Sequence, residues 1–190
     1  MTAENNQKMI FLSGKYVNLV GLTEDDALNS DWFSWFNDPD TTRFMQKGYF
    51  PNTAQQQLDF YRQHIVGNPS KLQLGIVASG ENTLVGIISL NNIDHLNQKA
   101  EISMIIGNAN FRQMRYTVEA MKLIIEHGFN ILNLHKIYGG TLSKDWADLL
   151  CKTLTFTPEG KLRQDIYKSG TFYDVHMVAV LRDEYKTQPA

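Results

Sequence analysis

The sequence predicts a single α/β domain, built as a mixed β-sheet that is covered by helices. Three observations support this fold class. The chain has 190 residues, enough for one domain with a substantial core. No repeat, low-complexity tract or linker divides it. Segments with strand periodicity and segments with helix periodicity follow one another in a mixed order.

The first part of the chain is predicted to form one strand and two helices. Residues 15–22 alternate loosely between apolar and polar side chains, which is typical of a strand. Thr23 is a good start for a helix, and this helix should end before Pro39, because proline disfavours helical geometry at the residue before it. A second helix is predicted for residues 54–66, since an Asn–Thr pair precedes it and Gly67 follows it.

Three strands and a long helix are predicted next. Residues 71–79 and 83–93 are joined by a Gly–Glu–Asn turn, so they should form an antiparallel hairpin. A polar turn then leads into a third strand, residues 100–107. In the helix that follows, apolar residues recur at helical spacing and should face the sheet: Met121, Ile124, Ile125, Gly128, Phe129 and Leu132.

The last part of the chain completes the sheet. A strand is predicted at residues 136–142 and a short helix at about 143–154. Two further strands, residues 162–168 and 172–182, are separated by a Ser–Gly turn and should pair as a hairpin.

Composition limits the classes of function. With 43% hydrophobic and 20% charged residues, the chain has the composition of an ordinary globular protein. A net charge of −2 predicts no strong attraction to nucleic acid or to an anionic membrane. No apolar run approaches the roughly 18 residues that span a membrane, and the first residues lack signal-peptide features, so a cytoplasmic location is expected.

Metal and disulfide chemistry are not predicted. Cys151 is the only cysteine, so no internal disulfide and no thiolate cluster can form. The five histidines show no metal-ligand spacing: His64, His95, His127, His135 and His176.

Three stretches of the sequence resemble the GNAT N-acetyltransferases, in particular the branch that acetylates ribosomal proteins and spermidine. They are AEISMIIG, TVEAMKLIIEHGFNILNLHKIYGGTL and EGKLRQDIYKSGTFYDVHMVAVLRDEY. The resemblance covers residues 15–185 of a single domain that spans 1–190. It implies a central, mostly antiparallel sheet with a splayed parallel strand pair, and acetyl-CoA as co-substrate in the wedge between these two strands.

The resemblance also implies where the cofactor lies. The pantetheine arm would hydrogen-bond to the backbone of residues 101–107, and the backbone N–H groups of Ile105, Ile106 and Gly107 would polarise the thioester carbonyl. The pyrophosphate would lie on the following turn and helix N-terminus, where unpaired N–H groups and the helix dipole favour an anion.

The phosphate-binding turn in such enzymes carries glycines, which accept positive φ and allow the backbone to approach the phosphates. This chain has none there. Its corresponding residues are Arg112, Gln113, Met114, Arg115, Tyr116 and Thr117. Positive φ at Arg115 or Thr117 would cost on the order of 1 kcal/mol each. Two features could replace the glycines: Arg112 and Arg115 can bind phosphate through their guanidinium groups, and Thr117 can cap the helix. The alternative is that both arginines are solvated surface residues.

The second half of the implied site also differs from the family pattern. Asp145 lies where such enzymes have an asparagine that contacts the cofactor. Cys151 replaces a tyrosine that protonates the leaving thiolate in many members, and Thr155–Phe156 replaces a Gly–Phe pair. A structural role is the default interpretation of Cys151, because Leu150 and Leu154 flank it.

Two side chains are candidates for the proton transfers. Glu101 can act as general base, directly or through water, or it can be a surface carboxylate paired with Lys99. Ser143 matches a serine that some relatives use as proton donor, and it can also cap the helix that it precedes; the two roles are compatible. An acceptor pocket could draw on aromatic and acidic residues near the first helices and the last hairpin: Trp32, Phe33, Trp35, Phe36, Asp38, Asp40, Tyr173 and Asp174.

The first hypothesis is therefore an acetyl-CoA-dependent N-acetyltransferase that acts on a primary amine. The acceptor would be a small molecule, such as an amino sugar or a polyamine, or a peptide N-terminus, and a homodimer is a common assembly in such enzymes. The alternative is a catalytically inactive relative that has lost acetyl-CoA binding and acts as a binding or assembly module. A third hypothesis is a protein that binds another acyl or nucleotide ligand in the altered cleft.

Overall fold

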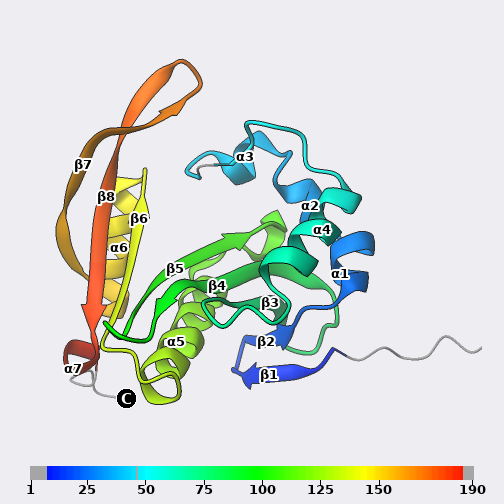
Figure 1. Ribbon diagram of the computed structural model, residues 1–190, viewed down its shortest axis with the longest axis horizontal. Helices are drawn as coiled ribbons and strands as arrows, with labels where there is room; N and C mark the ends of the chain where they lie inside the picture. Colours follow the sequence, from blue (N-terminus) through cyan, green and yellow to red (C-terminus); the bar gives the residue numbers. More distant parts are fainter. Residues whose placement is uncertain (1–7, 46, 186–190) are drawn as a thin grey trace, which may run out of the picture.

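The computed structural model describes residues 8–45 and 47–185, and it contains one eight-stranded sheet (Figure 1). The strand order is β1-β2-β3-β4-β5-β6-β8-β7, and every neighbouring pair is antiparallel except β5 and β6. The strands are β1 (Ile10–Ser13), β2 (Val17–Gly21), β3 (Leu72–Ala78), β4 (Leu84–Asp94), β5 (Lys99–Ile106), β6 (Lys136–Thr141), β7 (Thr157–Lys168) and β8 (Thr171–Leu181). The predicted mixed, mostly antiparallel sheet is confirmed.

Helices cover both faces of this sheet (Figure 1). On one face, a core cluster joins the first helices to β2, β3, β4 and β5. On the other face, the two longer helices after β5 and β6 pack on a second, larger cluster. The helices are α1 (Glu24–Asn29), α2 (Trp32–Trp35), α3 (Pro39–Thr42), α4 (Ala54–His64), η1 (Ala109–Phe111, a 3₁₀ turn), α5 (Met114–Asn130), α6 (Lys144–Leu154) and α7 (Arg182–Tyr185).

The first part of the chain differs from the prediction. The single helix predicted between Thr23 and Pro39 is two short helices, α1 and α2, and a third, α3, begins at Pro39. Thr23 does begin α1 with a capping box, but Ser30 is extended (ψ 171°) and ends that helix, and Pro39 occupies the first turn of α3. Strand β1 was not predicted, because its four residues show no alternation that distinguishes them from a tail.

The parallel pair β5–β6 is joined at three positions only. Lys99, Ala100 and Glu101 pair with residues 136–138, after which the two strands separate. Strand β5 nevertheless stays paired with β4 as far as Ile106, and β6 stays paired with β8 as far as Thr141. The facing edges of β5 and β6 beyond Glu101 therefore have no ladder partner, and the predicted splayed pair is confirmed.

The long β7–β8 hairpin is tied to the segment that connects α3 to α4. The Lys168 ammonium donates hydrogen bonds to the carbonyl oxygens of Thr42, Met45 and Lys47. The Tyr49 hydroxyl donates to the Tyr167 carbonyl at 2.9 Å. These hydrogen bonds join the end of the hairpin to the α3–α4 segment (Figure 1).

Among the described helices, none is long and apolar enough to cross a membrane. Within residues 8–45 and 47–185, no group of three or more histidine, cysteine, aspartate or glutamate side chains is arranged to hold a metal ion.

Candidate active site

The open edge of β5 presents backbone groups of alternate residues to the wedge. The Gly107 N–H donates to the Val85 carbonyl of β4 at 3.0 Å, so odd-numbered residues of β5 face β4. A Cβ added at Gly139 of β6 would lie 3.2 Å from the Ile102 carbonyl oxygen, which places the even-numbered carbonyls on the β6 side. The N–H groups of Met104 and Ile106 therefore point into the wedge.

This geometry corrects the predicted set of polarising groups. Of Ile105, Ile106 and Gly107, only Ile106 presents its N–H to the wedge. The Gly107 N–H is already bonded within the sheet, and Ile105 shares its orientation because strand residues alternate. Met104, which was not in the predicted set, takes the place of Ile105.

The loop after β5 needs no glycine. None of residues 107–117 has positive φ. The cause is the early start of α5, at Met114, which places Arg115 and Thr117 inside the helix with ordinary helical geometry. The prediction of backbone strain at these two residues is therefore wrong.

The N-terminus of α5 is open. Gln113 is the N-cap and its side chain makes no capping hydrogen bond. The predicted cap, Thr117, is instead buried in the helix, and its hydroxyl donates to the Gln113 carbonyl at 3.4 Å. The Tyr116 and Thr117 N–H groups donate to the Gln113 carbonyl, so the N–H groups of Met114 and Arg115 are the ones that can bind an anion.

The two arginines of the loop have different surroundings. The Arg112 guanidinium donates to the carbonyls of Ile106 (3.1 Å) and Gly107 (3.2 Å) and to the Thr41 hydroxyl (2.7 Å), and so joins the end of β5 to α3. The Arg115 guanidinium lies over the Tyr116 ring at 4.7 Å, and none of the ion pairs among the described residues includes it. Arg115 is therefore the arginine with charge available for a phosphate.

Glu101 lies at the closed end of the wedge. It is the last residue of β5 that pairs with β6, opposite Tyr138, and its carboxylate accepts a hydrogen bond from the Asn92 side chain at 3.2 Å. The expected alternative, an ion pair with Lys99, does not form in the structure. Burial raises the pKa of the Tyr138 hydroxyl, and the nearby Glu101 charge raises it further.

Ser143 follows β6, on the other side of the wedge. Its hydroxyl oxygen accepts the Trp146 N–H at 3.2 Å, so the predicted N-cap role is confirmed. The hydroxyl hydrogen remains available to donate. Asp145, in the first turn of the same helix, is exposed.

The other end of α6 carries the two remaining departures from the family pattern. Burial raises the pKa of the Cys151 thiol, and the Asp148 charge adds to this effect, so the thiol is not activated as a nucleophile. Thr155, which stands at the expected glycine position, has φ 55° and ends the helix in the left-handed region.

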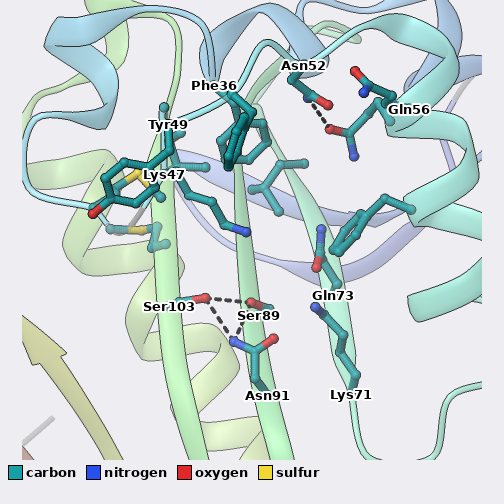
Figure 2. A pocket seen from close by; sticks show the side chains of 18 of the residues that line it. Phe36, Lys47, Tyr49, Asn52, Gln56, Lys71, Gln73, Ser89, Asn91 and Ser103 are labelled. Atoms are coloured by element: carbon teal, nitrogen blue, oxygen red, sulfur yellow. Dashed lines mark hydrogen bonds between the residues drawn. The ribbon is translucent and has the colours of Figure 1, made fainter. Parts of the chain in front are cut away.

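A pocket of about 570 Å³ opens beside β5, on the sheet face that α1–α4 cover. Met104 and Ile105 line it, so it borders the open edge of β5. Its floor carries a polar cluster in which the hydroxyls of Ser89 and Ser103 lie 2.8 Å apart and the Asn91 amide donates to both (Figure 2).

Of the predicted aromatic cluster, only Phe36 lines this pocket. Trp32 and Trp35 are core residues, as expected for most of the cluster. A second pocket, of about 510 Å³, lies between α3 and the β7–β8 hairpin, and Tyr173 lines it. The predicted acidic residues do not reach the first pocket: Asp38 caps α3 and lies 3.8 Å from Arg112, and Asp174 pairs with Lys161 at 2.6 Å.

Sequence reasoning missed the polar floor. Ser89 is buried (4% exposed) in an otherwise apolar strand, and it pairs with Ser103 across β4 and β5. A serine within each of two apolar strands was the available signal. It becomes informative only once the register places the two hydroxyls opposite each other.

Comparisons with known proteins agree with this architecture. Residues 17–148 match the family model described as an acetyltransferase (GNAT) domain. The chain is 27% identical to an uncharacterized N-acetyltransferase, p20, of Bacillus licheniformis, over 86% of this chain and 90% of that protein. It is 26% identical to a spermidine N(1)-acetyltransferase of Vibrio cholerae, over 67% of this chain and 72% of that protein.

A solved structure has the same fold. The crystal structure of spermidine N-acetyltransferase from Vibrio cholerae, in complex with CoA and spermine, superposes with a TM-score of 0.80 at 22% sequence identity, covering 92% of this chain and all of that one. Because the family model spans more than half of the sequence, the chain belongs to the GNAT acetyltransferase family.

Proposed function

We propose that this protein is an N-acetyltransferase that transfers the acetyl group of acetyl-CoA to a primary amine, either a small molecule or a peptide N-terminus. The observation that carries the proposal is the arrangement of two features side by side. The open edge of β5 offers unpaired backbone donors, and the 570 Å³ pocket borders the same strand at Met104. The open edge of β5 can hold a thioester, and the pocket can hold an amine.

The residues present fit acetyl-CoA. The edge of β5 from Ile102 to Ile106 has backbone groups without ladder partners for the amides of a pantetheine arm, although the Ile106 carbonyl already accepts from Arg112. Beyond it, the uncapped N-terminus of α5 supplies N–H groups and the positive end of the helix dipole for the pyrophosphate. Arg115 adds a positive side-chain charge in the first helical turn. Asp145, the other side chain predicted to contact the cofactor, is exposed on α6, across the wedge.

The chain's groups can perform each step of acetyl transfer. The N–H groups of Met104 and Ile106 stabilise the charge that develops on the carbonyl oxygen when the amine nitrogen attacks. Glu101, at the closed end of the wedge, takes the amine proton through water. As the carbon–sulfur bond breaks, the Ser143 hydroxyl donates its proton to the thiolate, while its oxygen keeps the Trp146 hydrogen bond.

The loop geometry bears on the alternative of an inactive relative. That hypothesis rested on the missing glycines, which were expected to leave the phosphate turn strained or blocked, and on the departures from the family pattern at Asp145, Cys151 and Thr155. The described loop has no positive φ, so glycine is not required for its conformation. The reason for expecting loss of the cofactor is thereby weakened, and the acetyltransferase is the better-supported function.

The test is release of CoA thiol on mixing the purified protein with acetyl-CoA and a panel of primary amines. We expect amine-dependent release, with acetylated product detected by mass spectrometry, and a loss of about 100-fold or more in kcat for Glu101→Gln. Wild-type turnover in both Glu101→Gln and Ser143→Ala would remove the roles assigned to these residues. Absence of amine-dependent release with every acceptor would contradict the proposed function.

A further inference from the structure

The pocket beside β5 is lined by apolar and aromatic side chains, by serine and amide groups and by two lysines, and no carboxylate among the described residues lines it. Lys47 enters it from the α3–α4 segment and Lys71 from the residue before β3, so that the two side chains approach from two sides, above the serine floor (Figure 2). None of the ion pairs among the described residues includes either lysine. The chain as a whole carries a net charge of −2, so the positive charge of this pocket is opposite in sign to that of the whole chain.

Lys71 has an aromatic neighbour but no carboxylate partner among the described residues. Its ammonium lies 4.9 Å from the centre of the Phe60 ring, a favourable cation–π contact. Burial lowers the pKa of Lys71, and the neighbouring Lys47 charge lowers it further. Lys71 is half-buried and Lys47 is exposed, and both line the same pocket. Like charges repel, and an anion between the two ammonium groups would relieve that repulsion.

A buried donor in the same pocket points to the same kind of ligand. Gln57 is 2% exposed and lines the pocket, and its Nε2 has no hydrogen-bond partner among the residues that the structure describes. Its Oε1 is already used, accepting the Asn52 amide at 3.0 Å. A buried donor without an acceptor is costly, so a ligand that brings an acceptor oxygen into the pocket would satisfy it.

We propose that the amine acceptor carries an oxyanion, either a carboxylate or a phosphate, which binds between Lys47 and Lys71 in the pocket beside β5. This inference rests on the proposed function, because it assigns the acceptor class for the same site. The pocket volume of about 570 Å³ accommodates a small molecule. A polyamine is disfavoured, since its remaining ammonium groups would meet two like charges and no carboxylate.

The two lysines also bear on the reactivity of the acceptor. A like charge nearby disfavours protonation of an amine, so the acceptor nitrogen loses its proton more readily in this pocket than in water. The pocket can therefore favour the nucleophilic, neutral amine although no carboxylate lines it. The proton leaves toward the wedge, where Glu101 lies.

The test uses acceptor pairs that differ only in the anion, at constant ionic strength. The pairs are O-phosphoethanolamine with ethanolamine, for phosphate, and glycyl-phenylalanine with its C-terminal amide, for carboxylate; spermidine is the cationic acceptor. We expect kcat/KM to be at least about tenfold higher for the anionic member of one pair, the scale of a hydrogen-bonded ion pair. The pair that shows the preference identifies the anion.

Variants connect the preference to the lysines. Lys71→Gln and Lys47→Gln should lower kcat/KM for the anionic acceptor about tenfold more than for the neutral one, while Lys71→Arg should retain the preference. Lys122→Gln is the matched control, because Lys122 is exposed on α5 and does not line the pocket. Equal kcat/KM within both pairs, a preference for spermidine, or equal losses for both members in Lys71→Gln would overturn the proposal.

A binding measurement separates this proposal from the proposed function. O-phosphoethanolamine or glycyl-phenylalanine should raise the melting temperature of the wild-type protein and not that of Lys71→Gln. If this stabilisation occurs and no acceptor is acetylated, the anion site stands and the proposed function fails. If neither compound stabilises the protein and neither is acetylated, the anion site is refuted.

Discussion

The contact between Gly107 and Trp35 makes a sharp prediction about the end of β5. A Cβ added at Gly107 would lie 1.9 Å from Cδ2 of the Trp35 indole, which is itself 6% exposed in the core between the sheet and the first helices. The φ of Gly107 is not positive, so the backbone alone would accept alanine. Glycine is thus required here by the tryptophan ring, independently of any cofactor.

Gly107→Ala should destabilise the protein by about 2 kcal/mol. Overpacking a filled core costs about 1–3 kcal/mol, and the smaller unfolded-state entropy of alanine offsets about 0.4–1 kcal/mol of this. For a domain of this size the change corresponds to a fall in melting temperature of about 4–8 °C. Chemical denaturation monitored by circular dichroism measures the free energy of unfolding directly.

The double variant tests the cause. Trp35→Leu alone should cost about 2–4 kcal/mol through loss of buried contacts, but it removes the ring that the Cβ would strike. In that background Gly107→Ala should cost less than about 0.5 kcal/mol, which gives a coupling energy of about 2 kcal/mol. Strictly additive costs would refute the steric explanation.

Three further predictions follow from other residues. Thr155 is β-branched at φ 55°, so Thr155→Asn should raise the free energy of unfolding by about 0.5–1 kcal/mol, and an unchanged or lower denaturation midpoint would contradict the assigned strain. Ser143→Asn should keep the helix cap but lose the proton donor, so the free energy of unfolding should stay within about 0.5 kcal/mol of wild type while kcat falls. Equal turnover in Ser143→Asn and wild type would leave Ser143 with the structural role alone. Burial lowers the pKa of His127, so the folded state binds this proton less readily than the unfolded state. The free energy of unfolding should therefore decline as pH falls below about 6.5, and His127→Gln should flatten this part of the pH profile. Unfolding titrations at several pH values measure both effects.

Much of the sheet could be predicted from the sequence. The β3–β4 and β7–β8 hairpins follow from alternating segments joined by short polar turns, and the α5 face follows from its 3.6-residue spacing. The break of the first helix could not, because Ser30 and Asp31 are compatible with a helix interior as well as with its end. There the packing of buried Trp32 and Trp35 takes precedence over local propensity.

The position of the candidate site in the fold could be predicted from the sequence, but the groups that face it could not. The wedge follows from the family resemblance, and the register decides which N–H groups face it. Met104 was therefore missed, and Ile105 and Gly107 were wrongly included. The start of α5 at Met114 could not be foreseen from a glycine pattern that the chain lacks. The pocket brings Lys47, Lys71 and Ser103 together from three separate segments, a proximity that only the folded chain creates.

Calorimetric titration of the protein with acetyl-CoA at moderate salt tests the central claim most directly. The account predicts saturable binding in the micromolar range, carried by the open edge of β5 and the uncapped N-terminus of α5, and weakened several-fold by Arg115→Gln. No heat of binding and no thermal stabilisation at millimolar acetyl-CoA would contradict it, since a cofactor that binds the folded state must stabilise that state.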